Sequence, residues 1–113
     1  MEAAPAIIDD LQRFAYEFGI RLEAARMTIE LTPGEMCKLL GCARSTYTSY
    51  IRGDSMIAAH RLAPLVARGI SCDYLLFGTT LAPNPETEAK LKANEAAARV
   101  DRETPTNKGR RDL

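Results

Sequence analysis

The sequence predicts an all-α fold, an orthogonal bundle of about five helices with short connections. Two observations support this prediction. Apolar residues recur at helical spacing from about Ile7 to Gly78, and glycine, proline and capping residues interrupt that pattern at short intervals. The 113-residue chain has room for one domain of about 70 to 80 residues plus extensions.

Composition places the chain among soluble proteins. Its hydrophobic share of 46% is ordinary for that class. No apolar run approaches the ~18 residues needed to span a bilayer. The opening MEAAPAIIDD lacks the positive start and the long apolar region of a signal peptide. We therefore expect a cytoplasmic protein.

A long first helix is predicted from about Ile7 to about Glu30, with Gly19 as the candidate position for a bend or break. Asp9 and Asp10 would lie in its first turn, where the helix dipole favours acids. The apolar positions that carry the helical pattern are Ile7, Ile8, Leu11, Phe14, Ala15, Phe18, Leu22, Ala25 and Ile29. The part before Phe14 either packs on the same domain, which we favour, or docks on a second subunit.

The stretch Thr32–Gly53 predicts two short helices joined by a tight turn. Thr32 and Glu35 form a T-x-x-E capping box, and Pro33 stands at the first helical position, where its missing N–H costs nothing. Gly41 is placed to end the first of these helices in the left-handed conformation.

The second of these helices is predicted to begin after Ala43. Tyr47, Tyr50 and Ile51 share one face, which we assign to the core. The other face is short, polar and basic, with no acidic residue, and consists of Arg44, Ser45, Thr46, Thr48, Ser49 and Arg52. Such a face fits the major groove of DNA better than it fits most alternatives.

Two further helices are predicted before Gly78. The first runs from about Ala58 to Arg68 and has Pro64 inside it, which should kink it. Its expected inward residues are Leu62, Leu65 and Val66. The second is the short segment CDYLLF, opened by Ser71 and closed by Gly78, with Leu75 and Leu76 facing the core.

Beyond Gly78 the composition becomes polar. Residues 86–103 contain strong helix formers but few large apolar residues, chiefly Leu91 and Val100, so this helix is marginal unless something packs on it. We interpret the final TPTNKGRRDL as a solubilising tail. The alternative is that its three basic residues touch phosphate; they are Lys108, Arg110 and Arg111.

Charge is distributed unevenly although the net charge is zero. Residues 1–37 carry seven acids against three arginines, whereas residues 38–70 carry five basic residues against Asp54 alone. The positive excess therefore coincides with the segment that carries the polar helix face, as phosphate binding requires.

Three cysteines are too few and too irregularly spaced to indicate a disulfide framework or a zinc site. They are Cys37, Cys42 and Cys72. Together with His60 they could supply four metal ligands, but we favour buried small hydrophobic residues. No cofactor site is predicted.

From about Phe18 to Gly78 the sequence resembles the lambda repressor/Cro-like helix-turn-helix family, also called XRE-type regulators. The matching pieces, in order, are RLEAAR, LTPGEMCKLLG, ARSTYTSYIRGD and GISCDYLLFG. The resemblance implies a lambda-repressor-like five-helix DNA-binding domain over residues 18–78. Residues 1–17 would then be a helical extension of the first helix, and residues 79–113 a polar extension or tail that is partly helical or disordered.

The resemblance also implies roles for nine residues. Those at positions that reach base edges are Arg44, Ser45 and Ser49. Those that flank them and touch a base or a phosphate are Thr46 and Thr48. Those at positions that meet the DNA backbone, or lie in the loop after the recognition helix, are Thr32, Lys38, Arg52 and Ser55.

Three positions depart from the family pattern. Pro33 replaces a frequent glutamine that bonds phosphate, and Ala43 replaces a capping Ser or Thr, a cap worth ~1 kcal/mol. Ile51 replaces a frequent glutamate and can only pack. The fold tolerates these changes, but they shift recognition onto the remaining polar residues.

The expected function is a sequence-specific, double-stranded DNA-binding transcriptional regulator, a phage- or prophage-type or small bacterial repressor. One such domain makes few base contacts, so we expect a homodimer on a two-fold operator. The candidate dimer surfaces are the N-terminal extension and the segment from Tyr74 through residues 86–103. The alternative is an antitoxin or antirepressor, a protein-interaction module that keeps the fold. No enzyme is expected, because the sole histidine, His60, has no evident nucleophile partner.

Overall fold

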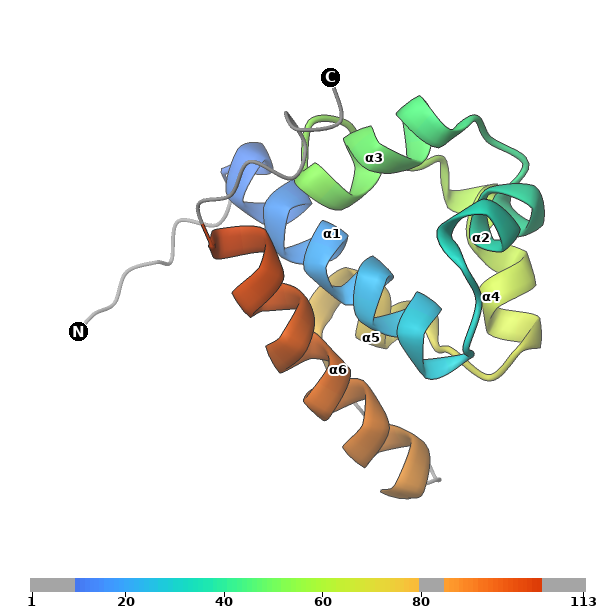
Figure 1. Cartoon of the computed structure of the whole chain (residues 1–113), viewed down its shortest axis with the longest axis vertical. Helices are drawn as coiled ribbons and strands as arrows, with labels where there is room; N and C mark the ends of the chain where they lie inside the picture. Colours follow the sequence, from blue (N-terminus) through green and yellow to red (C-terminus); the bar gives the residue numbers. More distant parts are fainter. Residues whose placement is uncertain (1–9, 80–84, 105–113) are drawn as a thin grey trace.

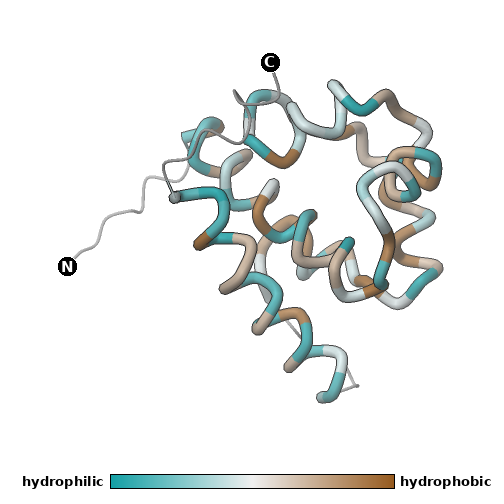
Figure 2. Tube along the Cα trace, viewed as in Figure 1, coloured by the Kyte–Doolittle hydropathy of each residue, from teal (hydrophilic) through white to brown (hydrophobic). Residues whose placement is uncertain are grey.

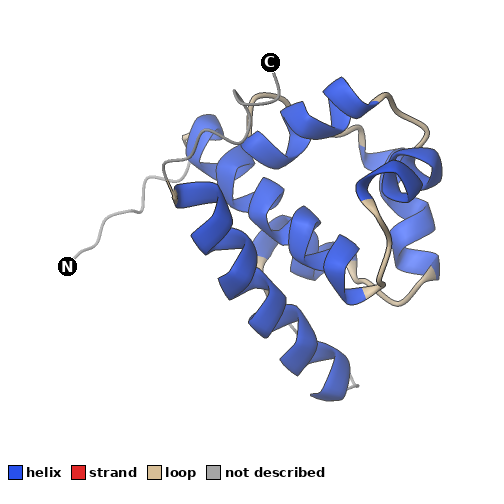
Figure 3. Ribbon diagram, viewed as in Figure 1, coloured by secondary structure: helices blue, strands red, loops and turns tan. Residues whose placement is uncertain are grey.

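The computed structural model describes residues 10–79 and 85–104, and these form an all-helical bundle with no strand in the described ranges (Figures 1 and 3). Its elements are α1 (Leu11–Thr28), α2 (Pro33–Leu40), α3 (Arg44–Arg52), the 3₁₀ segment η2 (Ala59–Leu62), α4 (Ala63–Ala67), α5 (Cys72–Phe77) and α6 (Pro85–Glu103). The prediction of an all-α fold is confirmed. Within the described ranges, none of the helices combines the length and the apolar character that crossing a bilayer requires.

One apolar core receives side chains from every element. Its members include Phe18, Met36, Tyr47, Leu62, Leu65, Tyr74 and Leu91, one from each helix in chain order. These side chains are at most 3% exposed. Burial of apolar side chains is the main driving force for the folding of a small domain.

The first helix starts later than predicted. Asp10 is its N-cap, and the Asp10 carboxylate accepts the Gln12 N–H at 3.0 Å, which satisfies one of the free donors of the first turn. The predicted turns that contain Ile7, Ile8 and Asp9 lie outside the described residues.

The predicted break at Gly19 is wrong, because α1 is continuous from Leu11 to Thr28. Gly19 is instead the point where α3 crosses α1. A Cβ on Gly19 would lie 2.4 Å from the carbonyl oxygen of Ile51 and 2.6 Å from that of Tyr50. Glycine is required there because two backbones touch.

The predicted single helix Ala58–Arg68 is also wrong. The segment consists of the 3₁₀ turn η2 followed by α4, and Pro64 lies in the first turn of α4, where it costs no hydrogen bond. A 3₁₀ turn has fewer residues per turn than an α-helix, so the inward face is rotated after it. Leu65 is therefore fully buried, whereas Val66, which was expected to face inward, is 47% exposed.

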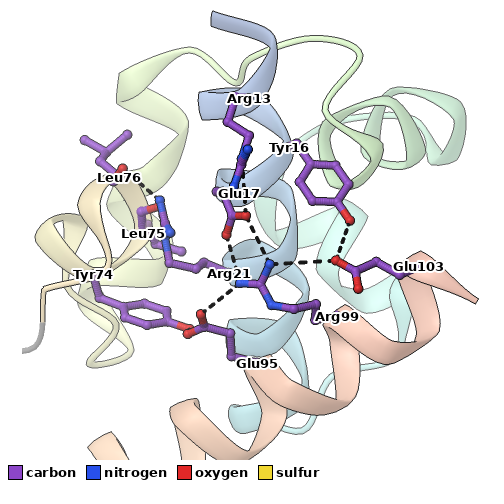
Figure 4. A network of polar contacts seen from close by, with 10 residues as sticks. All are labelled: Arg13, Tyr16, Glu17, Arg21, Tyr74, Leu75, Leu76, Glu95, Arg99 and Glu103. Atoms are coloured by element: carbon purple, nitrogen blue, oxygen red, sulfur yellow. Dashed lines mark hydrogen bonds and ion pairs between the residues drawn. The ribbon is translucent and has the colours of Figure 1, made fainter. Parts of the chain in front are cut away.

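The helix predicted at residues 86–103 is present as α6, which lies along α1 (Figure 1). Hydrophilic stretches are interspersed with apolar positions along it (Figure 2), and its buried residues are Leu91 and Ala98. Polar contacts supply the rest of the interface (Figure 4). The Arg99 guanidinium donates to both oxygens of Glu17 at 3.0 and 2.8 Å, and Asn94 Nδ2 donates to Thr28 Oγ1 at 2.8 Å.

The same packing changes the list of candidate dimer surfaces. Tyr74 is 1% exposed, and its hydroxyl donates to Glu95 of α6 at 3.0 Å. Tyr74 and the inner face of α6 therefore serve the protein's own core, so within the candidate segment from Tyr74 through residues 86–103 only the outer positions are open to a second copy. The outer face of α6 remains exposed.

Candidate nucleic-acid interface

The turn between α2 and α3 is fixed by its backbone conformation, by a backbone hydrogen bond and by the side chain of Arg61. Gly41 has the left-handed conformation predicted for it, with φ of 72°, and the Cys42 N–H donates to the Cys37 carbonyl at 3.0 Å. Arg61 closes the turn from η2, since its Nη1 donates to the carbonyls of Leu40 and Gly41 at 2.8 and 2.7 Å. The carbonyls of Cys37, Leu40 and Gly41 are thereby satisfied, which fixes the position from which α3 starts.

A polar cluster on α1 fixes the core side of α3. The Tyr47 hydroxyl donates to Glu23 Oε1 at 2.7 Å, and Arg26 donates to both Glu23 oxygens at 2.8 and 3.0 Å. Burial, together with the Glu23 carboxylate, raises the pKa of the Tyr47 phenol far above its ordinary value, so the hydroxyl remains a donor. Arg26 Nη1 also donates to the Leu31 carbonyl at 2.6 Å, which ties the α1–α2 loop to the same cluster.

The C-terminal end of α3 lies against α1 and α6. Gly53 ends the helix with φ of 82°, and a Cβ there would lie 2.8 Å from the backbone N and Cα of Tyr16. Arg102 of α6 donates from Nη2 to the Arg52 carbonyl at 3.1 Å. Its guanidinium also lies 5.0 Å from the centroid of the Tyr16 ring, a cation–π distance.

The predicted polar face of α3 is turned to solvent. Tyr47 and Tyr50 are buried on the opposite face, as predicted. The exposed residues of α3 among the candidates are Arg44, Ser45, Thr48 and Arg52, with Ser49 half-buried beside them. Their spacing of i, i+1, i+4, i+5 and i+8 puts them on one side of the helix. Thr46 is half-buried and falls outside this set, on the flank next to the core.

The loop after α3 adds one candidate to this face. Ser55 is exposed, and its hydroxyl donates to Ser49 Oγ at 3.1 Å, so these two predicted residues meet across Gly53. Arg52 lies 3.8 Å from Asp54, an exposed pair of small energetic weight. Among the described residues, Arg44 has no hydrogen-bond or ion-pair partner, so its guanidinium is available to a ligand.

The two candidates on α2, Thr32 and Lys38, are exposed. Thr32 caps α2 in the predicted box: its hydroxyl accepts the Glu35 N–H at 3.1 Å, and its own N–H donates to Glu35 Oε1 at 2.8 Å. These Thr32 contacts lower the pKa of Glu35. The Thr32 N–H is therefore already used, and only the hydroxyl hydrogen is left for a phosphate.

Sequence reasoning missed the arginines that position this face. Arg61 and Arg102 both donate to carbonyls at helix ends, and Arg21, which is 8% exposed, does the same for α5 through the carbonyls of Leu75 and Leu76 at 2.9 Å. Burial lowers the pKa of Arg21. No local signal marks such residues, because a free helix-end carbonyl recruits whichever arginine the tertiary fold brings near.

As far as the described residues go, the face offers the unpaired guanidinium of Arg44, a row of hydroxyls and the neighbouring cation of Arg52. It is a surface rich in hydrogen-bond donors. In the described ranges no group of three or more His, Cys, Asp or Glu side chains could hold a metal ion. The cysteines in those ranges are free, with Cys37 buried.

Comparisons with protein-family models, with curated proteins and with solved structures found no match for the chain.

Proposed function

We propose that the chain is a lambda-repressor-like, sequence-specific regulator of transcription that binds double-stranded DNA through the exposed face of α3. The observation that carries the proposal is this face itself. Its five candidate side chains contain no acid, and the opposite face of the same helix is buried through Tyr47 and Tyr50. A rigid helix with a free polar side is what a major groove accommodates.

In this proposal each candidate acts through its hydrogen-bonding chemistry. The exposed guanidinium of Arg44 can donate to O6 and N7 of one guanine at once, and the hydroxyls of Ser45 and Ser49 reach neighbouring base edges. Phosphates are bound by Arg52 at the end of the α3 face, by Ser55 in the loop after it and by Thr32 and Lys38 at α2, while Thr48 contacts a base or a phosphate. Thr46 on the flank is the least suited of the nine.

A homodimer on a two-fold operator is part of the proposal, since one α3 face contacts few base pairs. A repressor of the phage or prophage type would act by occupying such an operator. Leu11 and Phe77 are 67% and 65% exposed, and the Phe77 ring lies tilted against that of Phe14 at a centroid distance of 6.1 Å, so apolar surface is available for a second copy.

Selection of bound duplexes from a random pool tests the proposal, and a palindromic result is expected. Arg44→Ala should then weaken binding to the selected site by ~1–3 kcal/mol and relax the preference at one base pair. Arg13→Ala removes a positive charge from another exposed position, on α1, and should leave the base preference unchanged. An Arg44→Ala protein that selects the same site with the same stringency would contradict the role of Arg44.

The alternative is an antitoxin or antirepressor that uses the fold to bind a protein. The exposed Leu11 and Phe77 favour it, because apolar side chains of this size also suit a protein partner. The dependence of binding affinity on salt concentration distinguishes the two functions. Phosphate contacts lose affinity steeply as salt rises, whereas an apolar protein interface does not.

A further inference from the structure

Two cysteines lie on either side of the turn that joins α2 to α3 (Figure 1). Cys37 is buried in the last turn of α2, and Cys42 is half-buried directly after Gly41. Both side chains pack on the apolar core, and both are free thiols. The pair is therefore a dithiol at the junction from which α3 starts.

The backbone brings these two cysteines within the reach of a disulfide. The Cys42 N–H donates to the Cys37 carbonyl at 3.0 Å. When the bond lengths on either side of this hydrogen bond are added, the two Cα atoms can lie no more than about 7 Å apart. Disulfides usually span Cα–Cα distances of about 4.4 to 6.8 Å. The bridge therefore needs only a local adjustment of the turn.

The two thiols are also neighbours. Burial raises the pKa of the Cys42 thiol, and the charge and side-chain hydrogen bonding of Cys37 raise it further, while the Arg61 guanidinium opposes the shift. Such an influence acts over a few ångströms, so the two side chains point toward one another. Because the thiolate is the reactive form, the raised pKa keeps the pair reduced until an oxidant is in excess.

We propose that Cys37 and Cys42 form a redox modification site, which hydrogen peroxide oxidises to a disulfide across the α2–α3 turn. The more accessible Cys42 reacts first: its thiolate sulfur attacks one peroxide oxygen, the O–O bond breaks, and the leaving hydroxide takes the thiol proton to become water. The Cys37 sulfur then attacks the sulfenic sulfur of Cys42, the S–S bond forms, the S–O bond breaks and a second water leaves. The two sulfur atoms supply the two electrons that reduce the peroxide.

The disulfide would act on the face of α3 that the proposed function places in the groove, and this part of the inference rests on that function. Bonded sulfur atoms lie about 2.05 Å apart, closer than any non-bonded contact, so the new bond pulls Cys42 toward α2. Ala43 supplies no side-chain cap to hold the first turn of α3, and Arg44 follows it directly. Oxidation should therefore displace Arg44 and weaken binding to the selected duplex about tenfold, the loss expected for one bidentate base contact.

Tryptic mapping after treatment with hydrogen peroxide tests the disulfide, because Lys38 lies between the two cysteines. Cleavage after Arg26, Lys38 and Arg44 puts the cysteines on separate peptides, MTIELTPGEMCK and LLGCAR. The monomer band of a non-reducing gel should yield these two peptides as one linked species, which dithiothreitol separates. Absence of that species, or a linkage through Cys72 in its place, would overturn the site.

The effect on α3 is read from the affinity for the selected duplex before peroxide, after peroxide and after dithiothreitol. The wild type should lose affinity on oxidation and regain it on reduction, a comparison that needs no substitution. Cys42→Ser should give no linked peptides and should bind equally well before and after peroxide. Cys72→Ser, the matched control, removes the thiol at the start of α5 and should behave as the wild type does.

Two results would overturn the effect on recognition. One is an oxidised wild type with unchanged affinity, and the other is a Cys42→Ser protein that peroxide weakens as much as the wild type. A reduced wild-type chain that binds no duplex would overturn the proposed function instead, while the linked peptides would still decide the thiol site. The two failures are therefore distinguishable.

Discussion

The two ends of α3 are built differently. At the C-terminal end, backbone touches backbone: Gly53 lies on Tyr16, and Arg102 bonds the last carbonyl. At the N-terminal end, Ala43 provides no side-chain cap, and Arg44 and Ser45 are exposed. One end therefore anchors the helix to the fold, while the other can change its side chains at little cost in stability. Under the proposed function, base preference would be altered most readily by substitutions at the N-terminal end.

The largest effect should come from forcing α1 and α3 apart at their crossing. Gly19→Ala would place a methyl group 2.4 Å from the Ile51 carbonyl oxygen, an atom that cannot rotate away. We expect a loss of about 3 kcal/mol in the free energy of unfolding, at the upper end of overpacking costs. Urea denaturation followed by circular dichroism measures it.

Gly34→Ala is the matched control for that substitution. Gly34 is exposed in α2, and the nearest atom to a Cβ there is Thr32 Oγ1 at 4.0 Å. Alanine has the higher helix propensity, so this variant should be more stable by up to ~1 kcal/mol. Equal destabilisation by both variants would show that the α1–α3 crossing has no special role.

A smaller loss in the free energy of unfolding should follow when acid protonates Glu17. This carboxylate pairs with Arg99 and so helps to hold α6, which in turn contacts the C-terminal end of α3. The hydrogen bonds from Arg99 lower the pKa of Glu17 from its ordinary 4.5. Stabilisation by this carboxylate is complete above the unfolded value of 4.5 and is lost as the pH falls through the lower folded pKa. Allowing for solvent screening, we expect a loss of about 1 kcal/mol.

Urea denaturation between neutral pH and about pH 3 measures this loss, with Glu17→Gln as the comparison. The variant should be less stable than the wild type at neutral pH, and the difference should shrink in acid. Parallel pH profiles for the two proteins would mean that the pair does not hold α6.

The smallest expected change in stability concerns the N-terminal end of α3. Ala43 has the extended backbone of an N-cap, with φ of −78° and ψ of 162°, but no side chain that accepts a hydrogen bond. Ala43→Ser should supply that acceptor and stabilise the protein by ~0.5–1 kcal/mol. A rise in the urea midpoint with an unchanged m-value is the expected result. A decrease would show that the first turn of α3 is satisfied in some other way.

Local rules accounted for much of the fold and of the candidate site. The capping box of Thr32 and Glu35, the left-handed Gly41 and the buried face of Tyr47 and Tyr50 follow from residue type and spacing alone. These features depend on neighbours within about one helical turn, which is why a sequence pattern predicts them.

The misses share a different cause. Gly19 was the candidate position for a bend or break, whereas the reason for a glycine there is the approach of Ile51 from another helix. Pro64 was placed inside a helix because the pattern does not show where a 3₁₀ turn ends and an α-helix begins. In both cases the residue type allows more than one local structure, and the tertiary fold determines which one forms.

By itself the sequence determined that the chain is helical, where α2, α3 and α5 begin and end to within a residue or so, and which side of α3 is polar. Those outcomes come from propensity, capping and periodicity, which act over a few residues. Only the tertiary structure decided that α6 packs on α1, that Arg61 and Arg102 bind the ends of α2 and α3, and that Ser55 meets Ser49. Contacts between residues tens of positions apart depend on how the helices cross, and crossing is settled by the packing of the whole core.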